Sequence, residues 1–204
     1  MTQMIPPARP EMERKFAEDL LRAAGVDLSK PAILGRRGYY RDAMGVPGKN
    51  DRGIYDDALI IVSPTSYVTF NANTDPSSSR VGMAVLEPGL WRYQLGIHNS
   101  SKDPKTHQRY LALIQAAPVV VRRDGTESYA KGTKHPTYGE CLGNARWRGY
   151  FGINHHRGSG SSTSSEGCQT VVPAQYDAYI ALVKSEMQRY GMSAIPYLLT
   201  AREE

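Results

Sequence analysis

A histidine and a cysteine twelve residues apart are the side chains of this sequence best suited to chemistry. Segment 150–172 reads YFGINHHRGSGSSTSSEGCQTVV, with His156 before a loop of glycine and serine and Cys168 after it. A thiol of ordinary pKa, about 8.5, reacts as its thiolate. A neighbouring imidazole can take the thiol proton and return it to the leaving group. The pattern predicts nucleophilic catalysis by Cys168 with His156 as general base.

The residues around this pair suit the same chemistry. Gly167 leaves room for substrate and lets the backbone N–H groups of Gly167 and Cys168 point at a developing oxyanion. The composition of loop 158–165 is typical of a flexible linker. Because the loop lies between two ordered-looking segments, we interpret it as a functional turn. Side chains alternate along a strand, so His155 and His156 are expected to face opposite ways.

The segment resembles the catalytic motif of L,D-transpeptidases. In that family a strand ends in His-x-Gly, a loop of variable length follows, and Ser-x-Gly-Cys precedes a further strand and helix. The matching residues here are His156-Arg157-Gly158 and Ser165-Glu166-Gly167-Cys168. The resemblance covers residues 150–190, selects His156 over His155, and implies that Ser165 helps to shape the site. Around these catalytic residues we expect substrate to be bound by Arg157, Gly158, Tyr150 and Asn154.

The resemblance also implies a reaction and a substrate. Cys168 would attack an amide next to an L-centre of diaminopimelate in a peptidoglycan stem peptide, giving a thioester. Water would then hydrolyse the thioester, or an amine would convert it to a cross-link. No cofactor is implied. The form Ser-Glu-Gly-Cys-Gln-Thr is similar to a divergent branch found in small phage and prophage proteins, which makes a phage virion or a secretion machine a possible partner.

The sequence departs from the family motif beside the nucleophile. Glu166 stands where the family usually has histidine, and Thr170 where it usually has arginine. A carboxylate close to a thiol raises the thiol pKa. An active site therefore requires Glu166 to face solvent or to pair with an arginine, with Arg157 and Arg148 the leading candidates. If the site is active, the pKa of the Cys168 thiol is also expected to lie below that of a free thiol.

Three other functions fit parts of the sequence. The main alternative is a non-enzymatic virion or cell-wall protein that keeps the fold and binds peptidoglycan. A nucleic-acid-binding protein is disfavoured because no basic stripe or binding motif accompanies the modest charge. Asp56, Asp57 and Asp75 resemble the paired carboxylates of a glycosidase, although acids at strand ends and in turns are the favoured interpretation.

The remaining cysteine and histidines point to no metal site. Cys141, His135, His155, His156 and Cys168 lack the short spacings of zinc ligands, so no metal is expected. Cys141 is expected to be a bystander thiol. A bond to Cys168 in an oxidising compartment is the alternative, and it would inactivate the site.

Composition sets the class of protein. The 204 residues are 40% hydrophobic and 22% charged, which favours a globular domain and excludes a wholly disordered chain. A net charge of +5 suits an acidic partner such as a cell wall. Apolar runs such as 58–62 are far shorter than the ~20 residues of a bilayer span, so no membrane span is expected.

Segment 1–10 lacks the apolar core of a signal peptide, so a wall-active enzyme would need delivery by a phage particle, secretion or lysis.

The elements that must position the site form an α+β pattern. A helix is predicted from Pro10 to Gly25, with an apolar face of Phe16, Ala17, Leu20, Leu21 and Ala24, and a second from Pro173 to Gly191. Segment 106–116 is predicted as a short helix and segment 129–147 as a long loop. Residues 1–30 then form an arm and helix, and residues 31–204 one β-rich domain with an L,D-transpeptidase-like sheet or sandwich. Its predicted strands are 32–34, 58–62, 67–70, 81–86, 90–95, 119–122 and 195–200.

Overall fold

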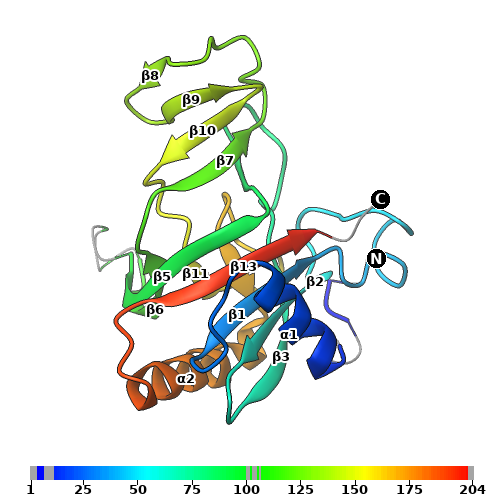
Figure 1. Cartoon of the computed structure of the whole chain (residues 1–204). Helices are drawn as coiled ribbons and strands as arrows, with labels where there is room; N and C mark the ends of the chain where they lie inside the picture. The colour runs from blue at the N-terminus through cyan, green and yellow to red at the C-terminus, as the bar shows by residue number, and fades with distance from the viewer. Residues whose placement is uncertain (1–3, 7–11, 100–101, 103–104, 106, 202–204) are drawn as a thin grey trace.

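The computed structural model describes residues 4–6, 12–99, 102, 105 and 107–201, which form two β-sheets and two helices. Figure 1 shows strands of the smaller sheet at the top of the molecule and the larger sheet below it. The α+β prediction is confirmed, with one helix near each end of the chain. Neither described helix is long and apolar enough to cross a membrane.

The larger sheet closes on itself. In the described part of the chain its eight strands follow the order β1-β13-β5-β6-β11-β12-β3-β2. The β1–β13 and β11–β12 pairs are parallel, and the other neighbours are antiparallel. The strands are β1 (Ala32–Arg37), β2 (Asp57–Val62), β3 (Tyr67–Asn73), β5 (Gly89–His98), β6 (Tyr110–Gln115), β11 (His155–Arg157), β12 (Gln169–Val171) and β13 (Ile195–Ala201).

The smaller sheet is built from segments between strands of the closed sheet. Its described strands follow the order β4-β7-β10-β9-β8 and all pair antiparallel. They are β4 (Ala84–Leu86), β7 (Val119–Arg123), β8 (Lys134–His135), β9 (Gly139–Gly143) and β10 (Arg146–Gly149). Because β10 leads directly into β11, the smaller sheet adjoins the strand that carries the two histidines.

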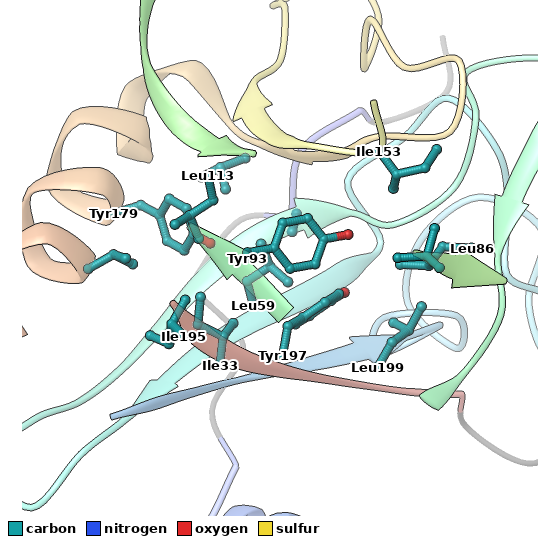
Figure 2. Packing of buried hydrophobic residues seen from close by; sticks show 14 of the residues in the cluster. Ile33, Leu59, Leu86, Tyr93, Leu113, Ile153, Tyr179, Ile195, Tyr197 and Leu199 are labelled. Carbon is teal, nitrogen blue, oxygen red and sulfur yellow. The ribbon is translucent and has the colours of Figure 1, made fainter. Parts of the chain in front are cut away.

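Alternation along β1 and β2 explains why each strand contains a continuous apolar run, at 32–34 and 58–62. Ile33, Leu59 and Ile61 join the main core inside the closed sheet, where Figure 2 shows Ile33 and Leu59 close to Tyr93 and Tyr197. Their neighbours Leu34 and Ile60 point the other way and pack in a second cluster with α1 (Arg14–Ala23). A strand buried on both faces reads as a continuous apolar run.

The second helix, α2 (Pro173–Arg189), has its first residue at Pro173 as predicted and is followed at Gly191 by a left-handed residue with a φ of 60°. Its side chains Tyr179, Ile180 and Val183 join the main core together with Phe70 and Leu113. Burial of these side chains fixes α2 against the strands that hold the site, since each apolar side chain removed from water contributes about 1.5–3 kcal/mol.

The first helix begins later than predicted. Its first residue is Arg14, while Pro10 lies outside the described residues. Ala17 and Leu21 are buried, but Phe16 is 49% exposed, so the apolar face is narrower than the sequence indicated. Gly25 follows the helix with a φ of 79°, as its predicted role as a stop requires.

Segment 106–116 was predicted as a helix, and that prediction is wrong for its described residues. Residues 110–115 form β6, which pairs with β5 on one side and β11 on the other. These two ladders outweigh the helix propensity of leucine, alanine and glutamine. Thr106 lies outside the described residues.

The loop predicted over 129–147 instead contains β8, β9 and the start of β10. These short strands have no apolar periodicity. They are held by a cluster of aromatic rings in which buried Trp147 lies 5.2 Å from Tyr129 and 5.5 Å from Tyr138, between ring centroids. Strand β4 is also shorter than predicted, because Gly82 turns the chain with a φ of 82° just before it.

Candidate active site

The parallel pair β11–β12 places the predicted histidine and cysteine on neighbouring segments of the chain. His155 lies opposite Gln169 and His156 opposite Thr170, and the N–H of Gln169 donates to the carbonyl of Asn154 at 2.8 Å. Because side chains alternate, His156 and Cys168 fall on one face of the pair. Both side chains line the same groove.

His155 faces the opposite way, into the closed sheet. It is fully buried, its ring centroid lies 4.3 Å from that of Tyr93, and its Nδ1 is hydrogen-bonded to the Tyr179 hydroxyl at 2.8 Å. Burial lowers the pKa of His155 to about 3. The two histidines are therefore separated as the sequence predicted, with His155 in the core.

The groove lies where the two sheets meet and has a volume of about 910 Å³. Segment 80–84, the end of β5 and the connection from β10 to β11 all contribute to its walls. Of the predicted site residues, Cys168, His156, Asn154 and Tyr150 line it. Arg157, Gly158, Ser165 and Gly167 do not line it.

The geometry of His156 defines which nitrogen can accept a proton. Its Nδ1 lies 2.9 Å from the carbonyl oxygen of Arg157, which can only accept, so the ring proton sits on Nδ1. Nε2 is then left as the acceptor. Burial, and secondly the charge of His98, lower the pKa of His156 to about 4. The imidazole is therefore neutral at pH 7, as a general base must be.

Cys168 is a partly buried thiol at the edge of β12. Its S–H donates to the carbonyl of Gly152 at 3.3 Å, and the N–H of Asn154 donates to its sulfur at 3.4 Å. Burial raises the pKa of Cys168 to about 11, the Asn154 N–H lowers it, and the charge of Glu166 raises it to a lesser extent. The sequence-based expectation of a thiol below its free value is thus not met in the ligand-free site.

The turn before Cys168 is fixed by Ser165. The Ser165 hydroxyl accepts the N–H of Gly167 at 3.0 Å and donates to the carbonyl of Cys168 at 2.7 Å. Gly167 has a φ of 137°, and a Cβ there would lie 2.5 Å from the carbonyl oxygen of Ala84. The turn therefore requires glycine. Of the two oxyanion donors predicted, the Gly167 N–H is already bonded, whereas the Cys168 N–H has no partner among the described residues.

The glycine–serine loop 158–165 is tied to the protein at both ends. The Tyr55 hydroxyl donates to the carbonyl of Ser159 at 2.7 Å, so closely that a Cβ at Gly158 would lie 2.0 Å from that hydroxyl. At the other end, Ser165 and Ser77 exchange two hydrogen bonds of 2.7 and 2.8 Å. Tertiary contacts of this kind support a functional turn over a linker.

Glu166 faces solvent and forms an ion pair with Arg80. The prediction that its charge is turned outward and neutralised therefore holds, but the partner is Arg80 instead of Arg157 or Arg148. The Arg157 guanidinium instead lies over the ring of Tyr110, 5.1 Å from its centroid, and donates to Gln108. Arg80 comes from a turn 86 residues upstream, which no local spacing could indicate.

Two groove residues were missed by the sequence reasoning. His98 ends β5, three residues beyond the end of the predicted strand, and its ring stacks on His156 with centroids 4.3 Å apart. This stack depends on the strand order β5-β6-β11 in the closed sheet, which no local sequence pattern indicates. Arg123 ends β7 and enters the groove from the smaller sheet, and no sequence pattern signals this approach.

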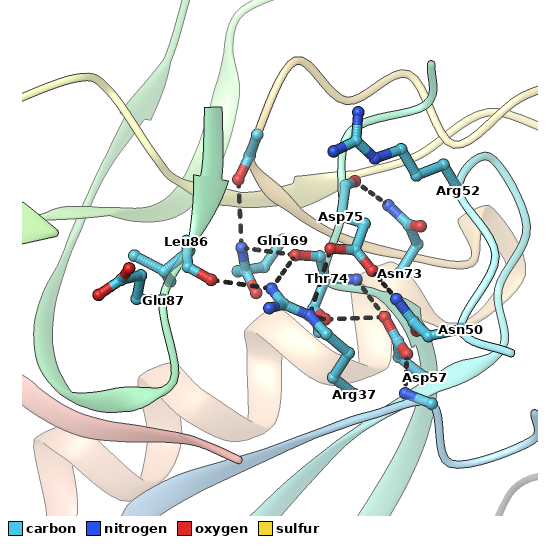
Figure 3. A network of polar contacts seen from close by, with 12 residues as sticks. Arg37, Asn50, Arg52, Asp57, Asn73, Thr74, Asp75, Leu86, Glu87 and Gln169 are labelled. Atoms are coloured by element: carbon cyan, nitrogen blue, oxygen red, sulfur yellow. Dashed lines mark hydrogen bonds and ion pairs between the residues drawn. The ribbon is translucent and has the colours of Figure 1, made fainter. Parts of the chain in front are cut away.

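Two of the three carboxylates considered for a glycosidase, Asp57 and Asp75, belong to a structural network (Figure 3). Asp57 accepts hydrogen bonds from the N–H groups of Gly38 and Thr74, and Asp75 forms an ion pair of 3.2 Å with Arg37. Both acids are buried with their oxygens engaged. The favoured interpretation of strand-end and turn acids therefore agrees with the structure.

The second cysteine is remote from this chemistry. Cys141 is buried in the smaller sheet, where its thiol donates to the carbonyl of Tyr129 at 3.5 Å, and both cysteines are free thiols. Across the described residues, no three histidine, cysteine or acidic side chains gather in a way that could hold a metal ion.

No family model, curated protein or solved structure matches this chain. The groove and the residues that line it are therefore the evidence for function.

Proposed function

We propose that the protein carries out cysteine-dependent acyl transfer or hydrolysis on peptidoglycan stem peptides, as an L,D-transpeptidase-like enzyme. The observation that carries the proposal is the placement of Cys168 and His156 in one groove, with the ring proton of His156 on Nδ1 and its Nε2 available as a base. The sequence motif around both residues supplies the substrate class.

The resting site is uncharged, and this defines the first step. A pKa of about 11 for Cys168 and about 4 for His156 differ by about 7. Both groups are therefore neutral at pH 7, which disfavours a preformed thiolate–imidazolium pair. Proton transfer therefore accompanies attack: as the Cys168 sulfur bonds to the carbonyl carbon, its proton passes to Nε2 of His156.

The tetrahedral intermediate then collapses. The C–N bond breaks, the proton on Nε2 passes to the leaving amine, and a thioester remains on Cys168. Water or a second amine, deprotonated by His156, attacks the thioester and releases the thiol. The N–H of Cys168, which has no partner among the described residues, is the oxyanion donor in this scheme, while Ser165 and Gly167 hold the turn that orients it.

One observation favours the alternative of a non-enzymatic virion or cell-wall protein. A buried thiol of raised pKa beside an imidazole of lowered pKa is also what a retained but silent site would show. The groove would then bind peptidoglycan without cleaving it.

Product analysis separates the two functions. Incubation with a stem tetrapeptide, followed by chromatography and mass spectrometry, is expected to yield the hydrolysed tripeptide or a cross-linked dimer. Cys168→Ala and His156→Ala should abolish the product, and Cys141→Ala should retain it. Loss of product in Cys141→Ala with activity kept in Cys168→Ala would overturn the assignment, and binding without any product would favour the structural role.

A further inference from the structure

Arg123 places a buried cation on the wall of the groove. The residue is 7% exposed, and its Nη1 donates to the carbonyl of Gly82 at 2.7 Å. Its guanidinium carbon lies 4.7 Å from the ring centroids of both Tyr138 and Phe151. These contacts hold the guanidinium in one orientation, so little freedom remains to be lost when a ligand binds.

No carboxylate neutralises Arg123 within the described part of the chain, and its Nε is buried without a hydrogen-bond partner. Arg37 provides the contrast, because it is equally buried and forms an ion pair with Asp75. Leaving a buried donor unsatisfied costs about 1–3 kcal/mol. Burial lowers the pKa of Arg123, although an arginine remains charged at neutral pH. The groove thus holds a cation that lacks an anion.

The charge of the groove as a whole has the same sign. Its charged lining residues in the described part of the chain are Arg80, Lys102, Arg123 and Glu166, and the single acid is paired with Arg80. Arg123 and Lys102 are left to attract an anionic ligand.

A short backbone segment links Arg123 to the nucleophile. Arg123 lies opposite Ala84 in the β4–β7 ladder and donates to the carbonyl of Gly82. The carbonyl of Ala84 in turn abuts Gly167, directly before Cys168. A ligand in the groove can therefore contact the guanidinium while one of its amides lies near the thiol.

We propose that Arg123 is the carboxylate-binding residue of the groove and holds a free carboxylate of the peptide that Cys168 attacks. The planar guanidinium fork matches a carboxylate in two parallel hydrogen bonds. Diaminopimelate carries a carboxylate beyond the one used in the chain, and the terminal residue of a stem peptide carries another. The inference deepens the proposed function, but carboxylate binding does not require catalysis.

Binding is measured by calorimetry with Cys168→Ala, so that no turnover occurs. The probes are a synthetic stem tetrapeptide with free carboxylates, two versions with either the terminal or the diaminopimelate carboxylate amidated, and an all-L tetrapeptide with a free terminus. Amidation of one carboxylate is expected to weaken binding tenfold or more. In Cys168→Ala/Arg123→Gln the free peptide should bind as weakly as the amide, so that the penalty of amidation disappears.

The matched control is Arg122→Gln. Arg122 neighbours Arg123 on β7 but is exposed and does not line the groove, so the amidation penalty should persist in that variant. Thermal unfolding checks that each variant is folded. Should Arg123→Gln not fold, the comparison of free and amidated peptides on the Cys168→Ala protein decides by itself.

Equal affinity for free and amidated peptides would overturn the proposal, as would a penalty unchanged by Arg123→Gln or the absence of binding by any probe. If the all-L peptide binds Cys168→Ala as tightly as the stem tetrapeptide does and is weakened equally by Arg123→Gln, the result would support the carboxylate site while counting against a peptidoglycan substrate. Because binding is measured on the inactive Cys168→Ala protein and the reaction is tested by product analysis, the binding proposal and the proposed reaction can fail independently.

Discussion

His98 and His156 stack in the groove with ring centroids 4.3 Å apart and planes inclined by 16°. His98 is partly buried, and its Nδ1 lies 3.4 Å from the side-chain nitrogen of Asn154. Two imidazoles in this contact cannot both carry a proton at low cost, because like charges oppose each other in a partly dry site. The charge of His98 is therefore a second cause, after burial, of the lowered pKa of His156.

Replacing His98 should change the titration of its neighbour. In His98→Phe, which keeps a ring for stacking, the pKa of His156 is expected to rise from about 4 toward its ordinary value without reaching it, because burial is the larger cause of the shift. Since the base acts unprotonated, the acid limb of any activity should move to higher pH. NMR titration of the His156 ring checks this, and an unchanged pKa would show that His98 exerts no charge effect.

The raised pKa of Cys168 predicts a distinctive pH dependence of alkylation. Below its pKa the thiolate fraction of a thiol rises tenfold for each pH unit. In Cys141→Ala, which leaves Cys168 as the single thiol, the iodoacetamide rate should climb from pH 7 to pH 10 without levelling off. A plateau near pH 8 would contradict the burial argument.

Glu166→Gln tests the departure from the family motif in the same assay. Because its charge is a lesser cause of the Cys168 shift and Arg80 neutralises it, the alkylation profile should move little. A sharp fall of the thiol pKa in this variant would mean that the carboxylate holds the thiol inert, which would favour the structural function.

The turn at Gly167 should not tolerate a side chain. Gly167→Ala is expected to lower the free energy of unfolding by about 2 kcal/mol or more, because the φ of 137° is strained for alanine and the new Cβ meets the carbonyl of Ala84. Gly160→Ala, in open space within the adjoining loop, is the matched control and should change stability by less than about 1 kcal/mol. Urea unfolding of both variants measures the difference, and equal effects would show that the turn is not constrained as described.

Local sequence patterns predicted the parts of the molecule whose stability is local. The apolar face of α2 and the run of β2 lie within a few residues of chain, so periodicity identifies both. The motif around Cys168 predicted a tight turn, and that turn is fixed by hydrogen bonds of Ser165 within three residues.

The features that the sequence patterns missed depend on contacts between residues far apart in the sequence. Strand β6 is a strand because β5 and β11 pair with its two edges, and Arg80 reaches Glu166 across 86 residues. The stacking of His98 on His156 likewise depends on the order of strands in the closed sheet. Neither propensity nor spacing encodes which segments become neighbours, so these residues emerge only from the fold.

A nucleophilic Cys168 must form a covalent acyl intermediate, which intact-protein mass spectrometry detects after incubation with muropeptides. The wild type and Cys141→Ala should gain the mass of the acyl donor, mapped by digestion to the peptide that holds Cys168. Cys168→Ala should gain none while its free energy of unfolding stays within about 1–2 kcal/mol of the wild type, because replacing this partly buried side chain leaves little cavity. An adduct that persists in Cys168→Ala, or its absence from the folded wild type under conditions that give product, would show that Cys168 is not the nucleophile.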